Sequence, residues 1–155
     1  MDETRDASSD FLWPPTIYGL ATLVAWGLSR VAPIAMPLPE AARWAGWGIV
    51  AVALALAGVA GIQFLRARTG TLPTSPTTAI VASGVYRFTR NPMYLAMTLA
   101  LFGLGLALAS PWFWLVAPAA VRLVTILAIE REEAYLTRKF GAAYLDYKSR
   151  VRRWI

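Results

Sequence analysis

Two polar clusters interrupt an otherwise strongly apolar chain, and both contain side chains that could bind a charged ligand. The first is the segment 84–94, Gly-Val-Tyr-Arg-Phe-Thr-Arg-Asn-Pro-Met-Tyr, which lies between two long apolar runs. The second is Glu132-Glu133, which follows the last apolar run. Arginines can bind a carboxylate, glutamates can bind an ammonium group, and aromatic faces can stack or hold a cation. If both clusters lie at one end of a hydrophobic bundle, they form two halves of one site.

The spacing around Glu132 and Glu133 indicates that their partners lie outside their own helix. Helical residues three and four positions apart are neighbours, and none of these positions carries a cation here. We therefore expect Arg87, Arg90 or a positively charged ligand to reach the glutamates. Adjacent helical residues point about 100° apart, so one glutamate could bind a ligand while the other holds an arginine. A solvated acidic patch is the alternative.

The composition favours a membrane protein and excludes several chemistries. Of 155 residues, 57% are hydrophobic and 15% are charged, whereas about a quarter are charged in a typical soluble domain. The chain contains no cysteine and no histidine, so we expect no disulfide, no thiolate or imidazole metal site, and no Ser-His-Asp chemistry. The net charge of +6 lies mostly beside apolar runs, where it would meet anionic lipid head groups rather than nucleic acid.

Four apolar runs have about the length that a helix needs to cross a hydrocarbon layer of roughly 30 Å. They cover about 16–38, 44–65, 93–109 and 112–129, and Ser110-Pro111 leaves room only for a tight hairpin between the last two. A helix over 130–140 should end at Gly141, and a second one should follow. The sequence thus predicts a single all-α domain over 1–155, an integral membrane four-helix bundle with cytoplasmic C-terminal helices at 130–155.

Basic residues set the expected orientation in the membrane. Arg66, Arg68, Arg87 and Arg90 lie between the second and third apolar runs, and the tail beyond Ile129 is also basic. Lys and Arg accumulate on the cytoplasmic side of membrane proteins. We therefore expect a bacterial inner-membrane protein with both termini, and both polar clusters, on the cytoplasmic side.

The segment 84–153 resembles the catalytic half of the membrane-embedded methyltransferases that include isoprenylcysteine carboxyl methyltransferase and phosphatidylethanolamine N-methyltransferase. Arg90-Asn91-Pro92-Met93-Tyr94 resembles the Arg-His-Pro-x-Tyr of that family, with Asn91 where the eukaryotic pattern has His. Gly103-Leu-Gly105 resembles the glycines of the next helix, and Glu132-Glu133-Ala-Tyr-Leu136 resembles Glu-Glu-x-x-Leu. The similarity continues at Phe140, Gly141, Tyr144, Tyr147, Lys148, Arg150 and Val151.

This resemblance implies S-adenosylmethionine as methyl donor and a lipophilic acceptor that arrives from the bilayer, without a metal. Methyl transfer depends on alignment more than on acid–base groups, so a chain without His or Cys can perform it. The candidate cofactor-binding residues are Tyr86, Arg87, Asn91, Pro92, Tyr94, Gly103, Gly105, Glu132 and Glu133. The candidate catalytic residues are Arg90, Glu133 and Arg122. A GxG within a membrane helix can also serve only close helix packing.

Arg122 is a candidate because it lies about 12 Å inside the fourth apolar run, where an unpaired charge is expensive and usually functional. Snorkelling to the interface is the alternative. Glu133 lies 11 positions further along, about 1,100° around an uninterrupted helix. The two side chains are therefore expected to line one inward wall, with a polar cavity for the acceptor.

Two other functions are compatible with parts of the sequence. A membrane reductase of similar C-terminal architecture would need a nicotinamide cofactor, but no Rossmann-type glycine loop is present. A small non-enzymatic scaffold or accessory protein would explain the apolar runs, but not the unpaired glutamates. The acceptor could be a prenylcysteine carboxylate, a phospholipid amine, a thiol or a small phenol, and the oligomeric state is also open.

Overall fold

The computed structural model describes residues 14–66 and 80–155, and the regular structure in these two ranges is entirely helical. Its elements in chain order are α1 (Pro14–Val31), α2 (Glu40–Arg66), the short 3₁₀ helix η1 (Gly84–Arg87), α3 (Pro92–Ala107), α4 (Trp112–Val124), the π-helix η2 (Thr125–Ile129), α5 (Glu130–Phe140) and α6 (Ala142–Arg150). The predicted all-α class is confirmed.

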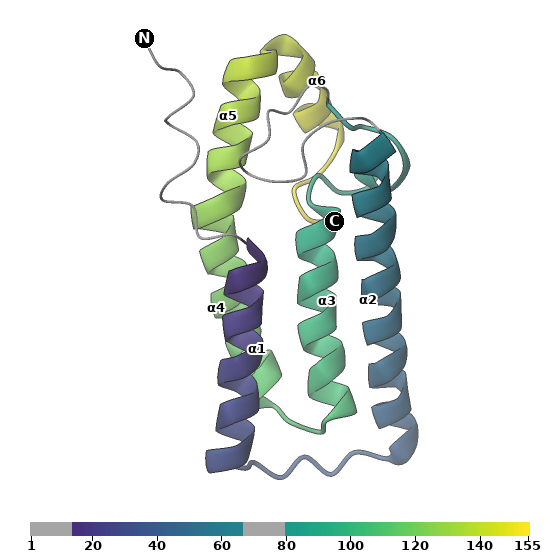
Figure 1. Ribbon diagram of the computed structural model, residues 1–155, viewed down its shortest axis with the longest axis vertical. Helices are drawn as coiled ribbons and strands as arrows, with labels where there is room; N and C mark the ends of the chain where they lie inside the picture. Colours follow the sequence, from purple (N-terminus) through teal and green to yellow (C-terminus); the bar gives the residue numbers. More distant parts are fainter. Residues whose placement is uncertain (1–13, 67–79) are drawn as a thin grey trace.

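Helices α1, α2, α3 and α4 run side by side along the long axis of the molecule (Figure 1). Helix α3 lies against α2 on one side and against α4 on the other, and α1 packs mainly on α4. Helix α4 continues through η2 into α5, which extends beyond the start of α3 (Figure 1). This extension carries Glu132 and Glu133 to the end of the molecule at which α3 begins.

Small residues allow α2 and α3 to approach each other closely. A Cβ atom added at Gly103 would lie 2.9 Å from the carbonyl oxygen of Gly46, and one added at Gly46 would lie 2.4 Å from the backbone nitrogen of Ala107. Both distances are too short for a real contact, so the two backbones touch directly at these glycines. Close backbone approach through small residues is typical of helix packing within a bilayer.

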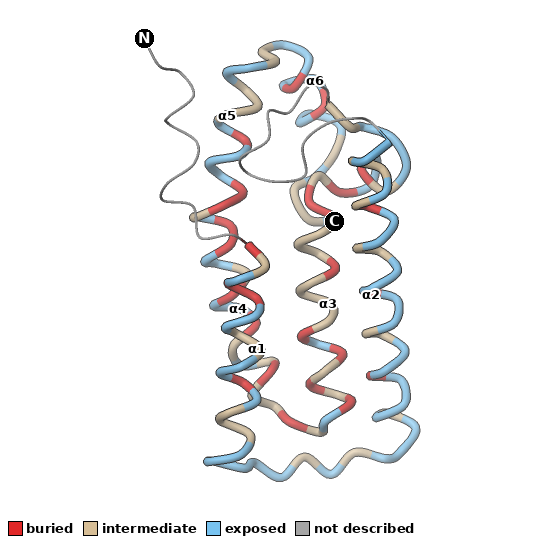
Figure 2. Tube along the Cα trace, in the orientation of Figure 1, coloured by how far each residue is buried: buried red, intermediate tan, exposed pale blue. Residues whose placement is uncertain are grey.

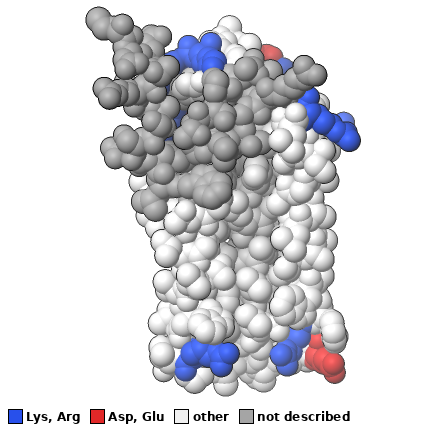
Figure 3. Space-filling view, viewed as in Figure 1, with Lys and Arg blue, Asp and Glu red and all other residues white. Residues whose placement is uncertain are grey.

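The apolar side chains are distributed as expected for a surface that faces hydrocarbon. The buried residues are largely small, and they include Ala25, Ala53, Ala60, Ala96, Ala117, Ala120 and Ala128. Large apolar side chains are exposed, among them Leu23, Trp44, Val52, Leu54 and Leu65. Helix α2 is exposed along most of its length (Figure 2), and Lys and Arg gather near the two ends of the visible face (Figure 3).

Within residues 14–66 and 80–155, two helices are long and apolar enough to cross a membrane, α2 and the continuous helix Trp112–Phe140 that joins α4, η2 and α5. The latter has 29 residues, about 43 Å at 1.5 Å per residue, so it exceeds a hydrocarbon layer of about 30 Å. It is therefore long enough to cross such a layer and to leave its last turns, in α5, outside it. Helix α3 is apolar but shorter. Four membrane spans and a cytoplasmic end remain predictions.

The first helix is shorter than the sequence analysis predicted. It ends at Val31 rather than near residue 38, and α2 begins at Glu40. Residues 32–39 include Pro33, Pro37 and Pro39. Proline lacks the amide hydrogen that a helix needs and disfavours helical geometry in the residue before it. The apolar character of this stretch concealed the break.

The π-helix η2 changes which side chains of the long helix point inward. A π-turn holds about one more residue than an α-turn, so the register beyond η2 is rotated by about 100° relative to an uninterrupted α-helix. Glu133 is buried, with 6% of its surface exposed, whereas Arg122 is exposed. The expectation that Arg122 and Glu133 line one inward wall is therefore wrong.

Candidate functional site

The two polar clusters of the sequence meet at Glu133, which is surrounded by three cations. Its Oε1 forms an ion pair with Nη1 of Arg90 at 3.0 Å and accepts a hydrogen bond from Nε of Arg153 at 2.9 Å. Its Oε2 accepts from Nη2 of Arg153 at 3.0 Å and lies 3.2 Å from Nζ of Lys148. We call Glu133, Arg90, Lys148 and Arg153 the Glu133 cluster.

Burial differs strongly among the members of the Glu133 cluster. The side chains of Glu133 and Arg90 are 8% and 9% exposed, whereas those of Arg153 and Lys148 are 33% and 42% exposed. Burial alone would raise the pKa of the Glu133 carboxyl, but the hydrogen bonds from Arg153 and Lys148 and the charge of Arg90 outweigh it. The pKa of Glu133 is therefore lowered, and the carboxylate is charged at neutral pH.

Local structure fixes Arg90 at the start of α3. Pro92 occupies the first turn of that helix, where its fixed φ suits a helix start and its missing N–H is not needed. The hydroxyl of Thr89 accepts a hydrogen bond from the Asn91 amide at 3.1 Å. Arg90 lies between Thr89 and Asn91, so this hydrogen bond holds its backbone on both sides.

The end of the chain returns to the same place. Gly141, with φ of +51°, ends α5 and allows α6 to fold back, because glycine adopts a positive φ without steric cost. The Arg90 amide then donates to the Arg152 carbonyl at 3.0 Å, and the Asn91 side-chain Nδ2 donates to the Arg153 carbonyl at 2.9 Å. Asn91, at the position where the resemblance has His, thus anchors the C-terminal segment.

Tyrosines surround the Glu133 cluster. The hydroxyl of Tyr144 accepts from Nη1 of Arg90 at 3.5 Å, and the hydroxyl of Tyr147 donates to the Tyr86 carbonyl at 2.7 Å. Burial raises the pKa of Tyr147 to about 12. The Tyr86 ring packs edge-on against Phe64 of α2, with ring centroids 5.0 Å apart. These contacts join α2, η1, α6 and Arg90, two residues before α3, into one assembly.

Glu132 has a different environment from its neighbour. It is exposed, and its Oε2 accepts a hydrogen bond from the Tyr94 hydroxyl at 3.4 Å. Among the residues that the structure describes, none forms an ion pair with Glu132. One glutamate thus holds arginines while the adjacent one is the partner of the Tyr94 hydroxyl, which is the division that the 100° separation of adjacent helical residues allows.

Two buried polar atoms have no partner within the described part of the chain. They are the hydroxyl of Tyr86, a residue only 4% exposed, and Nε of Arg90. Leaving a buried polar group unpaired costs about 1–3 kcal/mol. Both groups can donate to an anionic ligand, and Glu132 can accept from a cationic one. Such a set of side chains fits a ligand that carries both a carboxylate and an ammonium group.

Several candidate residues from the sequence do not join this site. Arg87 is exposed, and its guanidinium lies 4.6 Å from the centroid of the Phe88 ring. Gly103 packs on α2, and a Cβ at Gly105 would lie 2.3 Å from Nε1 of Trp114. These glycines lie about 16–20 Å along α3 from its start. Their contacts are those of helix packing. Arg122 is exposed on α4.

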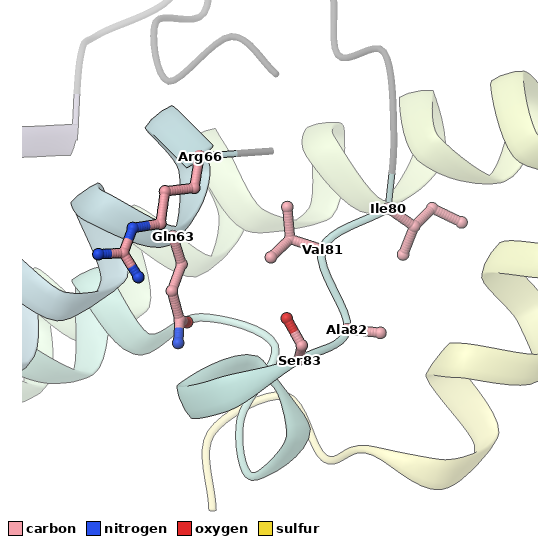
Figure 4. A pocket seen from close by; sticks show the side chains of 6 residues that line it. All are labelled: Gln63, Arg66, Ile80, Val81, Ala82 and Ser83. Carbon is pink, nitrogen blue, oxygen red and sulfur yellow. The ribbon is translucent and has the colours of Figure 1, made fainter. Parts of the chain in front are cut away.

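A separate pocket of about 640 Å³ borders the same end of the molecule (Figure 4). The described residues that line it are Gln63, Arg66, Ile80, Val81, Ala82 and Ser83. Its Gln63 also accepts a hydrogen bond from the Val85 amide at 3.3 Å. The neighbouring Gly84 has φ of +58°, and a Cβ there would collide with the Gln63 side chain. The pocket thus lies beside η1 and includes no member of the Glu133 cluster.

Arg153 is not among the site residues expected from the sequence, and Lys148 enters there only through the resemblance. The available signal was the run of four basic residues between 148 and 153, close in sequence to an acidic pair that lacks helical partners. That signal does not reveal which of the basic side chains reaches Glu133. Which basic side chains contact Glu133 is determined by the way α6 folds back on α5.

The structure is that of a small all-α protein with apolar helices and a cluster of charged side chains at one end of them. Comparison with known proteins identifies its family. A model of the phospholipid methyltransferase family matches residues 42–143, so the chain belongs to this family and the resemblance stated above is confirmed. An uncharacterised protein of Haemophilus influenzae is 40% identical over 63 residues, which are 41% of this chain and all of that protein. No solved structure matches the chain.

The matched range includes both polar clusters, at 84–94 and at Glu132-Glu133. It ends at residue 143, before Lys148 and Arg153. Two of the three cations that surround Glu133 therefore come from outside the matched range. Helix α1 also lies outside it.

Proposed function

We propose that this protein transfers a methyl group from S-adenosylmethionine to a lipophilic acceptor at the cytoplasmic face of a membrane. The observation that carries this proposal is the meeting of Arg90 and Tyr94 at the start of α3 with Glu132 and Glu133 on α5, in a chain of the phospholipid methyltransferase family. The arrangement joins a carboxylate that has no ion-pair partner among the described residues with two unpaired donors, next to aromatic side chains.

The available groups suit the polar end of this cofactor. Arg90 and the Tyr86 hydroxyl are donors for a carboxylate, and Glu132 is an acceptor for an ammonium group or for ribose hydroxyls. When bound, the cofactor supplies a methyl group on a sulfonium. Tyr94 carries an aromatic face next to Glu132, which suits a cation. The protein side chains then act by binding and orienting the reactants, which is the main requirement of an in-line transfer.

Glu133 supports this site indirectly. Its two oxygens are already engaged by Arg90, Arg153 and Lys148, so it has little capacity left for a ligand. We infer that Glu133 fixes the position of Arg90, whereas Glu132 contacts the cofactor. The roles proposed for Gly103, Gly105 and Arg122 in binding or catalysis have no comparable support in their contacts.

The placement in the membrane follows from the charges and the helix lengths. In this proposal α1, α2, α3 and α4 cross the bilayer, and the end that carries α5 and α6 faces the cytoplasm of a bacterial cell. Residues 66–90 and 131–155 hold 11 of the 15 basic residues, and Lys and Arg accumulate on the cytoplasmic side. The acceptor would then reach the site from the bilayer. A scaffold or a membrane reductase is not favoured by the family.

Calorimetry with S-adenosylhomocysteine on the detergent-purified protein tests the proposal. We expect saturable binding, weakened at least tenfold by Glu132→Gln. Glu40→Gln, which removes the same charge at the far end of α2, is the matched control and should bind like the wild type. Binding of a nicotinamide dinucleotide in place of S-adenosylhomocysteine would favour the reductase, and binding of neither would favour a non-enzymatic protein.

A further inference from the structure

We propose that the C-terminal segment is a functional part of the site, and that Arg153 is a positioning residue that holds Arg90 in its binding orientation. This inference rests on the proposed function for the meaning of that orientation. It concerns residues beyond the range that the family model matches, which ends at residue 143. The contacts that support it come from the backbone and from the side chain of the segment.

The backbone of residues 152–153 is attached to the residues just before α3. The Arg152 carbonyl accepts from the Arg90 amide at 3.0 Å. The Arg153 carbonyl accepts from both the Thr89 hydroxyl at 3.2 Å and the Asn91 side chain at 2.9 Å. Three consecutive residues, 89–91, are thus tied to two consecutive residues at the end of the chain. The position of Arg90 depends directly on this attachment.

The side chain of Arg153 acts on Arg90 through Glu133. It donates two hydrogen bonds to Glu133, one to each oxygen, at 2.9 and 3.0 Å. A planar guanidinium that contacts both oxygens fixes the plane of the carboxylate, which a single contact does not. Arg90 and Lys148 each contact only one oxygen of Glu133. Arg153 is therefore the residue that orients the carboxylate from which Arg90 takes its own position.

This arrangement leaves Arg90 ready for a ligand. The side chain is 9% exposed, its Nη1 is held by Glu133, and its Nε has no partner among the described residues. Loss of the Arg153 side chain would let the Glu133 carboxylate rotate and would loosen the C-terminal segment. Arg90 would then lose its fixed direction without losing its charge.

Two measurements on Arg153→Ala test the inference. The first is hydrogen exchange of the peptide that contains Arg90, in the absence of any ligand. We expect faster exchange of its amides than in the wild type, because the Arg152 carbonyl is no longer held in place. The second is binding of S-adenosylhomocysteine, which we expect to weaken at least tenfold, or about 1.4 kcal/mol. Millimolar guanidinium ion should restore part of this loss, whereas a merely unstable fold would not respond.

Arg150→Ala is the matched control, because it removes the same charge three residues earlier. Arg150 is 67% exposed and pairs with Asp146 on α6, so this variant should exchange and bind like the wild type. Arg153→Lys keeps the charge but loses the two-point contact, and should lie between the wild type and Arg153→Ala. If Arg153→Ala does not fold, the lysine variant decides the question.

The outcomes separate the two proposals. The positioning role would be overturned if Arg153→Ala had the hydrogen exchange and the affinity of the wild type. Where Arg153→Ala does not fold, the same result in Arg153→Lys would overturn it. Faster exchange in a protein whose wild type does not bind S-adenosylhomocysteine would support the attachment of Arg90 and refute the proposed function. Equal losses in Arg150→Ala and Arg153→Ala would indicate a general effect of basic charge, and would also overturn the positioning role.

Discussion

Replacement by glutamine should have different effects at the two adjacent glutamates: Glu133→Gln should lower the stability of the fold, whereas Glu132→Gln should weaken ligand binding. Glu133→Gln leaves the buried Arg90 without its carboxylate partner, whereas Glu132→Gln removes a charge that is exposed and contacts only Tyr94. Removing one partner of a buried ion pair costs about 3–5 kcal/mol. The contacts of Arg153 and Lys148 are half exposed and contribute less. Because glutamine keeps one acceptor oxygen, we expect a loss of about 3 kcal/mol for Glu133→Gln.

Thermal unfolding in detergent measures this difference. At about 2–4 °C per kcal/mol for a chain of this size, Glu133→Gln should lower the midpoint by roughly 6–12 °C. Glu132→Gln should change the midpoint by less than about 2 °C, since surface substitutions usually cost within 0.5 kcal/mol. For binding of S-adenosylhomocysteine, Glu132→Gln should still be defective at temperatures well below its midpoint.

Equal destabilisation by the two substitutions would mean that the burial of Glu133 and the exposure of Glu132 do not describe the protein in detergent. Unchanged ligand affinity in Glu132→Gln, with a binding wild type, would remove Glu132 from the site. Because the two variants differ by one position and carry the same change of charge, electrostatic effects of the whole protein cancel in the comparison.

Gly103→Leu should destabilise the protein by about 2 kcal/mol or more, measured by thermal unfolding, because its side chain would collide with Gly46 of α2; a wild-type midpoint would contradict the close packing. Acidification should lower the unfolding midpoint: the lowered pKa of Glu133 stabilises the fold above the unfolded pKa of about 4.3, and this contribution is lost as the pH falls through the lower folded value. Glu133→Gln should flatten that dependence, and an unchanged slope would refute it. Arg90→Lys should reduce methyl transfer at least tenfold because a point charge cannot replace a planar two-point donor, whereas wild-type turnover would remove Arg90 from the proposed cofactor site. A topology reporter inserted at Ser110 should read external and one fused after the C-terminus cytoplasmic; a cytoplasmic signal at Ser110 would exclude the proposed spans.

Much of the helical architecture could be predicted because length and apolar composition dominate membrane helices. The helix over 130–140 and its end at Gly141 agree with the structure. The end of the first helix, at Val31, was missed because apolar residues continue past Pro33, and apolar composition alone does not show where a helix ends. Helix starts and ends were otherwise found within a few residues.

The candidate site could be predicted in part. The missing helical partners of Glu132 and Glu133 indicated a contact from elsewhere, and Arg90 lies 3.0 Å from Glu133. Arg153 could not be found, because its contact with Glu133 depends on the turn at Gly141 and on the path of α6. The relation between Arg122 and Glu133 failed for another reason. Counting 100° per residue assumes α-helical turns throughout, and nothing in Thr125–Ile129 announces a π-helix.

That π-helix also determines where the chain can change length. A π-turn differs from an α-turn by about one added residue, so removal of one residue from Thr125–Ile129 can restore regular α-helix while α5 keeps its face toward the Arg90 side. Removal of one residue from within α4 would instead rotate everything beyond it by about 100°. Insertions and deletions in this long helix should therefore be tolerated at residues 125–129 and selected against elsewhere. A one-residue gap at 125–129 in an alignment of related sequences would then reflect the loss of the π-turn.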